Sequence, residues 1–168
     1  MQRVAKSLIC ILLICFLCSC SFVGDADFMI FQDRFNENNK TFKIEESTIT
    51  SETKDNYTKY NCFLDTKTEG KYLMTVNERT NNKIVTSCTL CILSSFELNI
   101  ENVQNIFCSM LFAYNQTDPE KALEMFKKLG LNETETYQTS GSTTQKFDDI
   151  KIKVIVNGAG TSITIYKS

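Results

Sequence analysis

Residues 100–131 read IENVQNIFCSMLFAYNQTDPEKALEMFKKLGL, and this stretch predicts two consecutive α-helices. Large apolar residues recur every three or four positions from Ile100 to Tyr114, which is the period of one face of a helix. Asp118 and Pro119 then supply a helix N-cap and a first-turn proline. The second helix is apolar along one face and ends at Gly130, a residue type that favours a left-handed C-terminal cap. We therefore expect a helical hairpin whose apolar faces pack on a core.

The segments on either side of this hairpin are rich in β-branched and aromatic residues with partial period-2 alternation, which predicts β-strands. The expected strands are residues 41–50, 57–65, 71–78 and 83–93 before the hairpin, and 134–139, 143–147, 150–156 and 161–166 after it. Turns are predicted at 79–82, 140–142 and 157–160. A helix is predicted from residue 28 to 38, because Phe28, Phe31 and Phe35 recur at helical spacing after a suitable N-cap, Asp27.

The order of these elements predicts an α+β fold. Helices and strands are segregated along the chain without βαβ alternation, which favours an antiparallel sheet. We expect roughly six to eight strands, with the helical hairpin and the N-terminal helix packed on one face. Residues 28–168 are enough for one domain and too few for two.

The first 19 residues predict an export signal. Arg3 and Lys6 precede an apolar run over residues 8–17, which is too short for the ~20 residues that a membrane-spanning helix needs. A wider stretch, residues 7–23, reaches the lower limit for a span. An uncleaved membrane anchor is therefore the alternative.

Leu17, Ser19 and Cys20 at the end of this run resemble the lipobox of bacterial lipoproteins, in which Leu at −3 and a small residue at −1 precede the modified cysteine. Cys18 at −2 departs from the usual Ala, Ser or Thr, so ordinary cleavage near Cys20 is an alternative. The resemblance implies that Cys20 becomes the N-terminus and carries a diacylglyceryl thioether. Residues 20–27 are then a tether, and the protein is anchored outside the cytoplasmic membrane by its lipid.

Charge and composition narrow the classes of partner. The signal holds two of the 18 basic residues, so 16 remain against 20 acidic ones. This mild acidity argues against nucleic acid and against an anionic lipid surface as partners, because both need clustered Lys and Arg. The chain contains no histidine, the commonest general base, and no catalytic motif. We expect no enzyme activity and no cofactor.

Four cysteines lie beyond the anchor: Cys62, Cys88, Cys91 and Cys108. Cys88 and Cys91 have the CxxC spacing, but in a strand residues three apart are ~10 Å apart, beyond the ~7 Å limit for a disulfide. We expect structural thiols, or disulfides that join one of this pair to Cys62 or Cys108. The alternative is a thiol-disulfide or metal-handling lipoprotein, which requires Cys88 and Cys91 to lie exposed at a helix start with a lowered pKa.

The sequence also contains possible glycosylation sites. Asn-x-Thr sequons begin at Asn39, Asn56, Asn115 and Asn132, so a secreted, disulfide-containing glycoprotein is a second alternative that predicts sugar on Asn56 or Asn132.

Aromatic residues of the predicted strands form a binding surface if they lie on an open sheet face, although about half of them belong to the core of any sheet covered on one side. They are Tyr57, Tyr60, Phe63, Tyr72 and Tyr166. The sequence therefore predicts a small, non-catalytic, lipid-anchored module at the cell envelope. We expect it to bind a protein, peptide or envelope ligand through its sheet or its hairpin loops.

Overall fold

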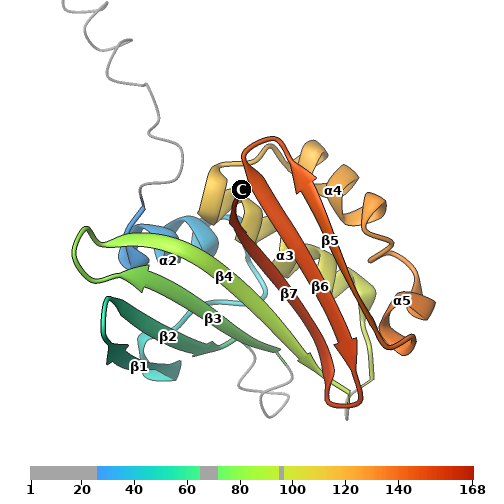
Figure 1. The fold of residues 1–168 in the computed structure, drawn as a ribbon, viewed down its shortest axis with the longest axis horizontal. Coiled ribbons are helices and arrows are strands. Elements are labelled where there is room, and N and C mark those ends of the chain that lie inside the picture. The colour runs from blue at the N-terminus through green and yellow to red at the C-terminus, as the bar shows by residue number, and fades with distance from the viewer. Residues whose placement is uncertain (1–25, 65–71, 95–96) are drawn as a thin grey trace, which may run out of the picture.

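The computed structural model describes residues 26–64, 72–94 and 97–168, and it has the predicted α+β architecture (Figure 1). The elements are α2 (Phe28–Asn38), a short 3-10 helix η1 (Glu46–Thr48), β1 (Ile49–Lys54), β2 (Tyr57–Phe63), β3 (Tyr72–Arg79), β4 (Ile84–Leu93), α3 (Ile100–Asn115), α4 (Pro119–Lys128), α5 (Thr134–Gln138), β5 (Gly141–Phe147), β6 (Ile150–Asn157) and β7 (Gly160–Lys167). The predicted signal, Cys20 and most of the tether lie outside the described residues.

The strands form one antiparallel sheet in the order β1-β2-β3-β4-β7-β6-β5. The first four strands form one antiparallel meander, and β5 to β7 form a second one. The two meanders join along β4 and β7, where Cys88 lies opposite Ile165 and Leu90 opposite Ile163. Residues that are far apart in sequence thus meet at the centre of the sheet.

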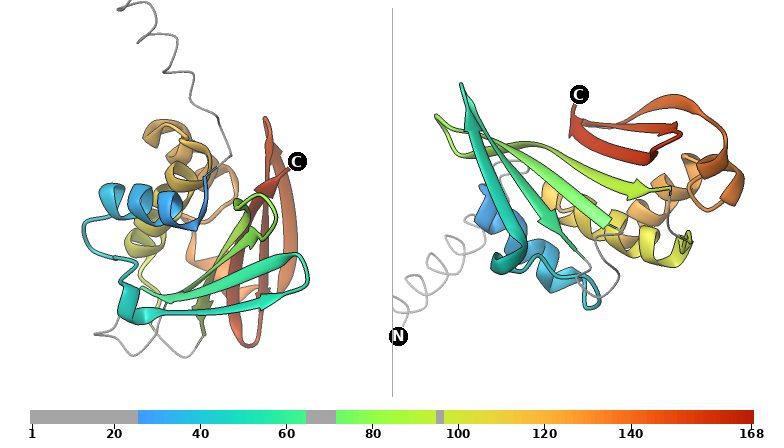
Figure 2. Two further views of the ribbon diagram at one scale, coloured as in Figure 1. Left: turned by 90° about the vertical axis from the view of Figure 1, so that its left-hand side faces the viewer. Right: turned by 90° about the horizontal axis from the view of Figure 1, so that it is seen from below.

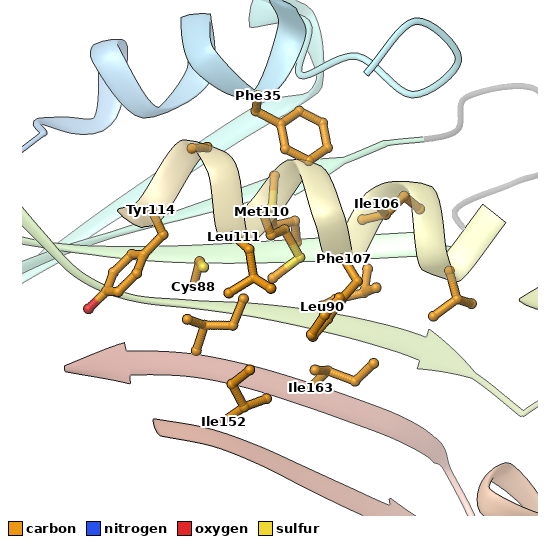
Figure 3. Packing of buried hydrophobic residues seen from close by; sticks show 14 of the residues in the cluster. Phe35, Cys88, Leu90, Ile106, Phe107, Met110, Leu111, Tyr114, Ile152 and Ile163 are labelled. Atoms are coloured by element: carbon orange, nitrogen blue, oxygen red, sulfur yellow. The ribbon is translucent and has the colours of Figure 1, made fainter. Parts of the chain in front are cut away.

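The helices gather on one side of this sheet, as expected (Figure 2). Helix α3 packs against α2, α4 and β4. In Figure 3 its residues Phe107 and Leu111 lie between Phe35 of α2 and the sheet residues Cys88 and Leu90. All five of these residues are buried in one continuous apolar cluster. None of the helices formed by the described residues lies on the opposite side of the sheet (Figure 2).

The helical hairpin is confirmed, together with its predicted caps. The Asp118 carboxylate accepts the backbone N–H groups of Glu120 and Lys121, with Pro119 in the first turn. Gly130 follows α4 with φ +70°, and its N–H donates to the carbonyl of Lys127 at 2.9 Å. The N–H of Leu131 donates to the carbonyl of Phe126 at 3.1 Å, which completes a Schellman motif.

Helix α2 is confirmed with the predicted bounds, and two carboxylates hold its N-terminus. Asp27 accepts the N–H of Ile30, while the Glu78 carboxylate of β3, only 2% exposed, accepts the N–H of Phe28 at 2.8 Å. The carbonyl of Ala26 also accepts the N–H of Val85. The folded part therefore includes Ala26 and Asp27, two residues that the sequence assigned to the tether.

The predicted strand at 41–50 is wrong over most of its length. Side chains of α2 and its C-cap form hydrogen bonds with the backbone N–H groups of this segment, so these groups do not pair with a strand. Asn39 accepts the N–H groups of Thr41 and Phe42, and Asn36 accepts the N–H of Ile44. The strand forms instead at Ile49–Lys54, which pairs with β2.

The predicted strand at 134–139 is also wrong, because this segment forms the short helix α5. Its hydroxyl groups bind the end of the preceding helix and loop: Thr136 donates to the carbonyl of Gly130 at 2.7 Å, and Tyr137 donates to that of Leu131 at 2.8 Å. The predicted turn at 140–142 is extended from Gly141 onward, as the start of β5. The remaining strands lie where the sequence predicts them, within the described residues.

Within the described residues, no helix has both the length and the apolar character needed to cross a bilayer.

Candidate functional site

The candidate site is the side of the sheet that faces away from the helices, which we call the open face. Buried and half-buried residues alternate along the central strands, as the period of two requires. In β3, Met74 and Val76 point into the core, whereas Leu73, Thr75 and Asn77 lie half-buried on the open face. The same alternation continues through β4, β7 and β6.

Hydroxyl and amide side chains cover the centre of the open face. The strand registers align Asn61, Thr75, Thr89, Thr164 and Lys153 in one row across five strands. Thr75 donates to the Asn61 amide oxygen at 3.0 Å, and the hydroxyls of Thr89 and Thr164 lie 3.0 Å apart. These bonds hold neighbouring polar groups at set positions across the strands.

A second row holds the same kind of contact, because the Asn77 amide donates to the Ser87 hydroxyl at 3.0 Å.

Cations flank this polar centre on both sides. By strand register and alternation the open face carries Lys54, Lys59 and Arg79 on β1 to β3, and Lys146, Lys151 and Lys153 on β5 and β6. Its acidic side chain is Glu52 of β1. Within the described part of the chain, none of these six cations lies within ion-pair distance of a carboxylate. The fold therefore concentrates basic charge that the overall composition conceals.

The structure divides the five predicted aromatic residues between the two faces. Tyr57, Phe63 and Tyr166 lie on the open face, and Tyr57 is 44% exposed. Tyr60 and Tyr72 belong to the core side: the Tyr60 ring stacks on Phe28 at 3.8 Å, and Tyr72 meets Phe42 edge to face. Burial and the neighbouring Glu78 carboxylate raise the pKa of Tyr60.

A cavity of about 330 Å³ lies at the end of the β4–β7 ladder, next to the last pair, Ser87 and Tyr166. Arg79, Asn82 and Tyr166 line it, together with residues of β4. A second cavity of about 290 Å³ lies between α2, α3 and the start of α4, and Asn39, Cys108 and Thr117 contribute to its wall.

The four cysteines are free thiols, so the cross-element disulfides that the sequence allowed are not formed. Cys88 and Cys91 lie in β4 as predicted, on opposite faces of the sheet. Cys62 and Cys88 are fully buried, while Cys91 on the open face and Cys108 on α3 are half-buried.

Burial raises the pKa of every one of these thiols, to about 12 at Cys62 and about 11 at Cys108. At Cys91 the Lys59 ammonium partly opposes this effect. A redox pair needs an exposed helix start and a lowered pKa, and Cys88 and Cys91 have neither. Among the described residues, no group of three or more Cys, Asp, Glu or His side chains is placed to hold a metal ion.

The structure also sorts the four sequons. Asn39 is 3% exposed, and its amide bonds to the N–H groups of Thr41 and Phe42 and to the carbonyl of Asn105, which leaves no room for a glycan in the folded protein. Asn115 is half-buried and its amide donates to Asp149. Asn56 and Asn132 are exposed, and these are the two positions at which the glycoprotein alternative predicts sugar.

The gathering of six cations on the open face is the feature that the sequence analysis did not predict. Its signal was present in the alternation of Lys151 and Lys153 with the buried residues Ile150 and Ile152, which places both lysines on one face of a strand. The register that brings Lys59 and Arg79 onto the same face could not be read from the sequence. Comparisons of the chain with family models, with curated proteins and with solved structures found no match.

Proposed function

We propose that this protein is a non-catalytic binding domain whose ligand sits on the open face, and that a lipid on Cys20 holds it outside the cytoplasmic membrane. The observation that carries the binding function is the open face itself, with its ordered polar centre and its six cations, none of which forms an ion pair with a carboxylate of the described residues. Exposure alone is not the argument, because antiparallel sheets commonly face water on one side.

The arrangement of charge on this face works against stability. Lys146 of β5 and Lys151 of β6 lie directly opposite each other in the strand register, and like charges in that position destabilise a sheet. Residues that destabilise the local structure, with no other contact that offsets the loss, occur mainly at functional sites. An anionic group bound between these two lysines removes their repulsion, which supports a ligand on this face.

Photo-crosslinking tests the binding function without knowledge of the ligand. A benzophenone amino acid replaces Thr89, at the centre of the open face, in cells that produce the full-length protein. The control carries the same group at Lys127, an exposed position on α4. We expect adducts of higher mass from position 89 and none from position 127, in variants that melt like the wild type. Equal yields at the two positions, or no adduct from position 89, contradict the proposal.

The anchor is tested by the intact mass of protein extracted from the membrane fraction. We expect a chain that begins at Cys20 and carries the mass of the acyl groups, because two or more acyl chains make a durable anchor. A Cys20→Ala variant is expected to lose both the acyl mass and membrane retention. A variant that is processed and retained like the wild type contradicts the lipid anchor and leaves the binding function standing. Glycan mass on Asn56 or Asn132 is read in the same spectrum.

A further inference from the structure

We infer that the ligand of the open face is an acidic polysaccharide, a linear sugar polymer that carries carboxylate or phosphate groups. The inference rests on the proposed binding function and names the chemistry of the partner.

The spacing of the cations on the open face favours a polymeric ligand. One row of the open face begins at Glu52 on β1 and runs across the strands through Lys59, Asn77, Ser87, Tyr166, Lys151 and Lys146. Lys59 on β2 and Lys151 on β6 are four strand spacings apart, which is ~19 Å at ~4.8 Å per strand. Anionic groups must therefore recur over at least this length of the ligand, as they do in a polymer.

The uncharged stretch between the two cation groups favours a sugar. Asn77 and Ser87 in this row, with Thr75 and Thr89 in the next, present amide and hydroxyl groups that both donate and accept hydrogen bonds. Sugar hydroxyls have the same double capacity. The Tyr166 ring beside Lys151 offers an apolar plane against which a sugar ring can lie.

A single-stranded nucleic acid fits this face less well. Such strands bind through aromatic side chains on which successive bases stack. The row from Lys59 to Lys151 contains one ring, that of Tyr166, and the strands β3 and β4 contribute no aromatic side chain to the open face.

An anionic bilayer also fits less well, because the sheet is twisted. Neighbouring strands rotate by ~20–25° on average, so β2 and β6 differ in direction by ~80–100°. Figure 2 shows this progressive rotation from β1 to β5. The two cation groups therefore face different directions, and one flat lipid surface cannot meet both, whereas a flexible polymer can follow the curved face.

The cavity beside this row supplies a recess for one anionic substituent. Arg79 and Tyr166 both line it. A guanidinium group binds carboxylate and phosphate oxygens through two parallel hydrogen bonds.

The test measures binding of the full-length protein to polygalacturonate by calorimetry, at low and at moderate salt. Neutral dextran, poly(U) and phosphatidylglycerol vesicles serve as the competing probes. The open-face variant is Lys59→Gln, Lys151→Gln and Lys153→Gln together. Its matched control is Lys40→Gln, Lys127→Gln and Lys128→Gln together, which makes the same change in net charge on the helical side of the molecule.

We expect salt-sensitive binding to polygalacturonate and little to dextran. We expect the open-face variant to bind about tenfold more weakly or worse, and the control variant to bind like the wild type. The inference is overturned if polygalacturonate does not bind, if poly(U) or the vesicles bind more tightly through the same three lysines, or if the control variant is equally impaired. Crosslinking at position 89 in any of these cases means that the binding function stands and only the partner is wrong.

Discussion

Gly160 shows how closely the two halves of the sheet approach each other. Its φ is +146°, and a Cβ atom at this position lies 2.1 Å from the carbonyl oxygen of Ile92. Gly158, two residues earlier in the same turn, has no atom within 4 Å of the same position. The two glycines therefore differ sharply in their tolerance of a methyl group.

A Gly160→Ala substitution is expected to destabilise the protein by about 2–3 kcal/mol, because the backbone of β4 must shift and the φ is unfavourable for alanine. Gly158→Ala is expected to change the free energy of unfolding by less than about 0.5 kcal/mol. Urea unfolding followed by circular dichroism measures both. Equal stability of the two variants contradicts the close approach of Gly160 to Ile92.

The hydroxyl of Tyr137 gives a second prediction at this scale. It donates to the carbonyl of Leu131 at 2.8 Å, and burial raises its pKa well above the ordinary value of 10. Tyr137→Phe leaves this buried carbonyl without its donor and is expected to cost about 1 kcal/mol. Tyr57→Phe, at an exposed position, is the control and is expected to be neutral. A neutral Tyr137→Phe variant, measured by the same unfolding assay, excludes a stabilising role for this hydrogen bond.

At the scale of elements, the docking of α2 depends on a carboxylate from the sheet. Glu78 accepts the N–H of Phe28 at 2.8 Å and lies 3.6 Å from the Lys83 ammonium. It lies beside a bulge in which Thr86 of β4 is the extra residue. A negative charge at the start of a helix is favourable because the helix dipole is positive there. This contact joins residues that are 50 positions apart in sequence.

Glu78→Gln is expected to destabilise the protein by about 1–2 kcal/mol, since the amide can still accept the N–H but has lost the charge. Glu52→Gln on the edge strand β1 is the control, with an expected change below about 0.5 kcal/mol. The free energy of unfolding in urea decides between them. If the two variants are equally stable, the charge on Glu78 does not hold α2.

The elements that the sequence predicted correctly have local signals. Asp27, Asp118 and Gly130 cap helices through contacts with residues two or three positions away, and such contacts can be read from spacing. The two wrong strands, 41–50 and 134–139, fail for the opposite reason. Asn36 accepts the N–H of Ile44, and the carbonyl of Gly130 accepts the hydroxyl of Thr136. The sequences of the two segments contain no signal for these partners. The open face was predictable as an uncovered side of the sheet, but its cations come together only through the register of distant strands.

At the scale of the whole molecule, burial of thiols and phenols makes stability depend on alkaline pH. Burial raises the pKa of Cys62 from about 9 to about 12 and that of Cys108 to about 11, and it raises those of Cys88 and Tyr114 as well. Between the unfolded and the folded pKa values the folded state binds more protons than the unfolded state. The free energy of unfolding therefore falls as pH rises through this window.

We expect full stability below about pH 8.5 and a progressive loss from pH 9 toward pH 12, with a slope of at most ~1.4 kcal/mol per pH unit for each thiol. Urea unfolding at pH 7, 9 and 10 with a reductant present measures the loss. A Cys62→Ala variant is expected to lose less stability than the wild type over this interval, each relative to its own value at pH 7. Stability that is independent of pH up to 10 contradicts the burial of these groups.

The seam between β4 and β7 governs the order in which the molecule can assemble. Thr89 and Thr164 bond across it although they are 75 residues apart in sequence. By contrast, only two to four residues separate the strands of the β1–β2, β3–β4, β5–β6 and β6–β7 hairpins. Closing so long an intervening chain costs configurational entropy, and this cost precedes the favourable contacts across the seam. The two meanders therefore form early, and their pairing is the slow step. Until that step, each meander exposes the bare backbone of its innermost strand, and the chain is then most vulnerable to pairing with a neighbouring copy of itself.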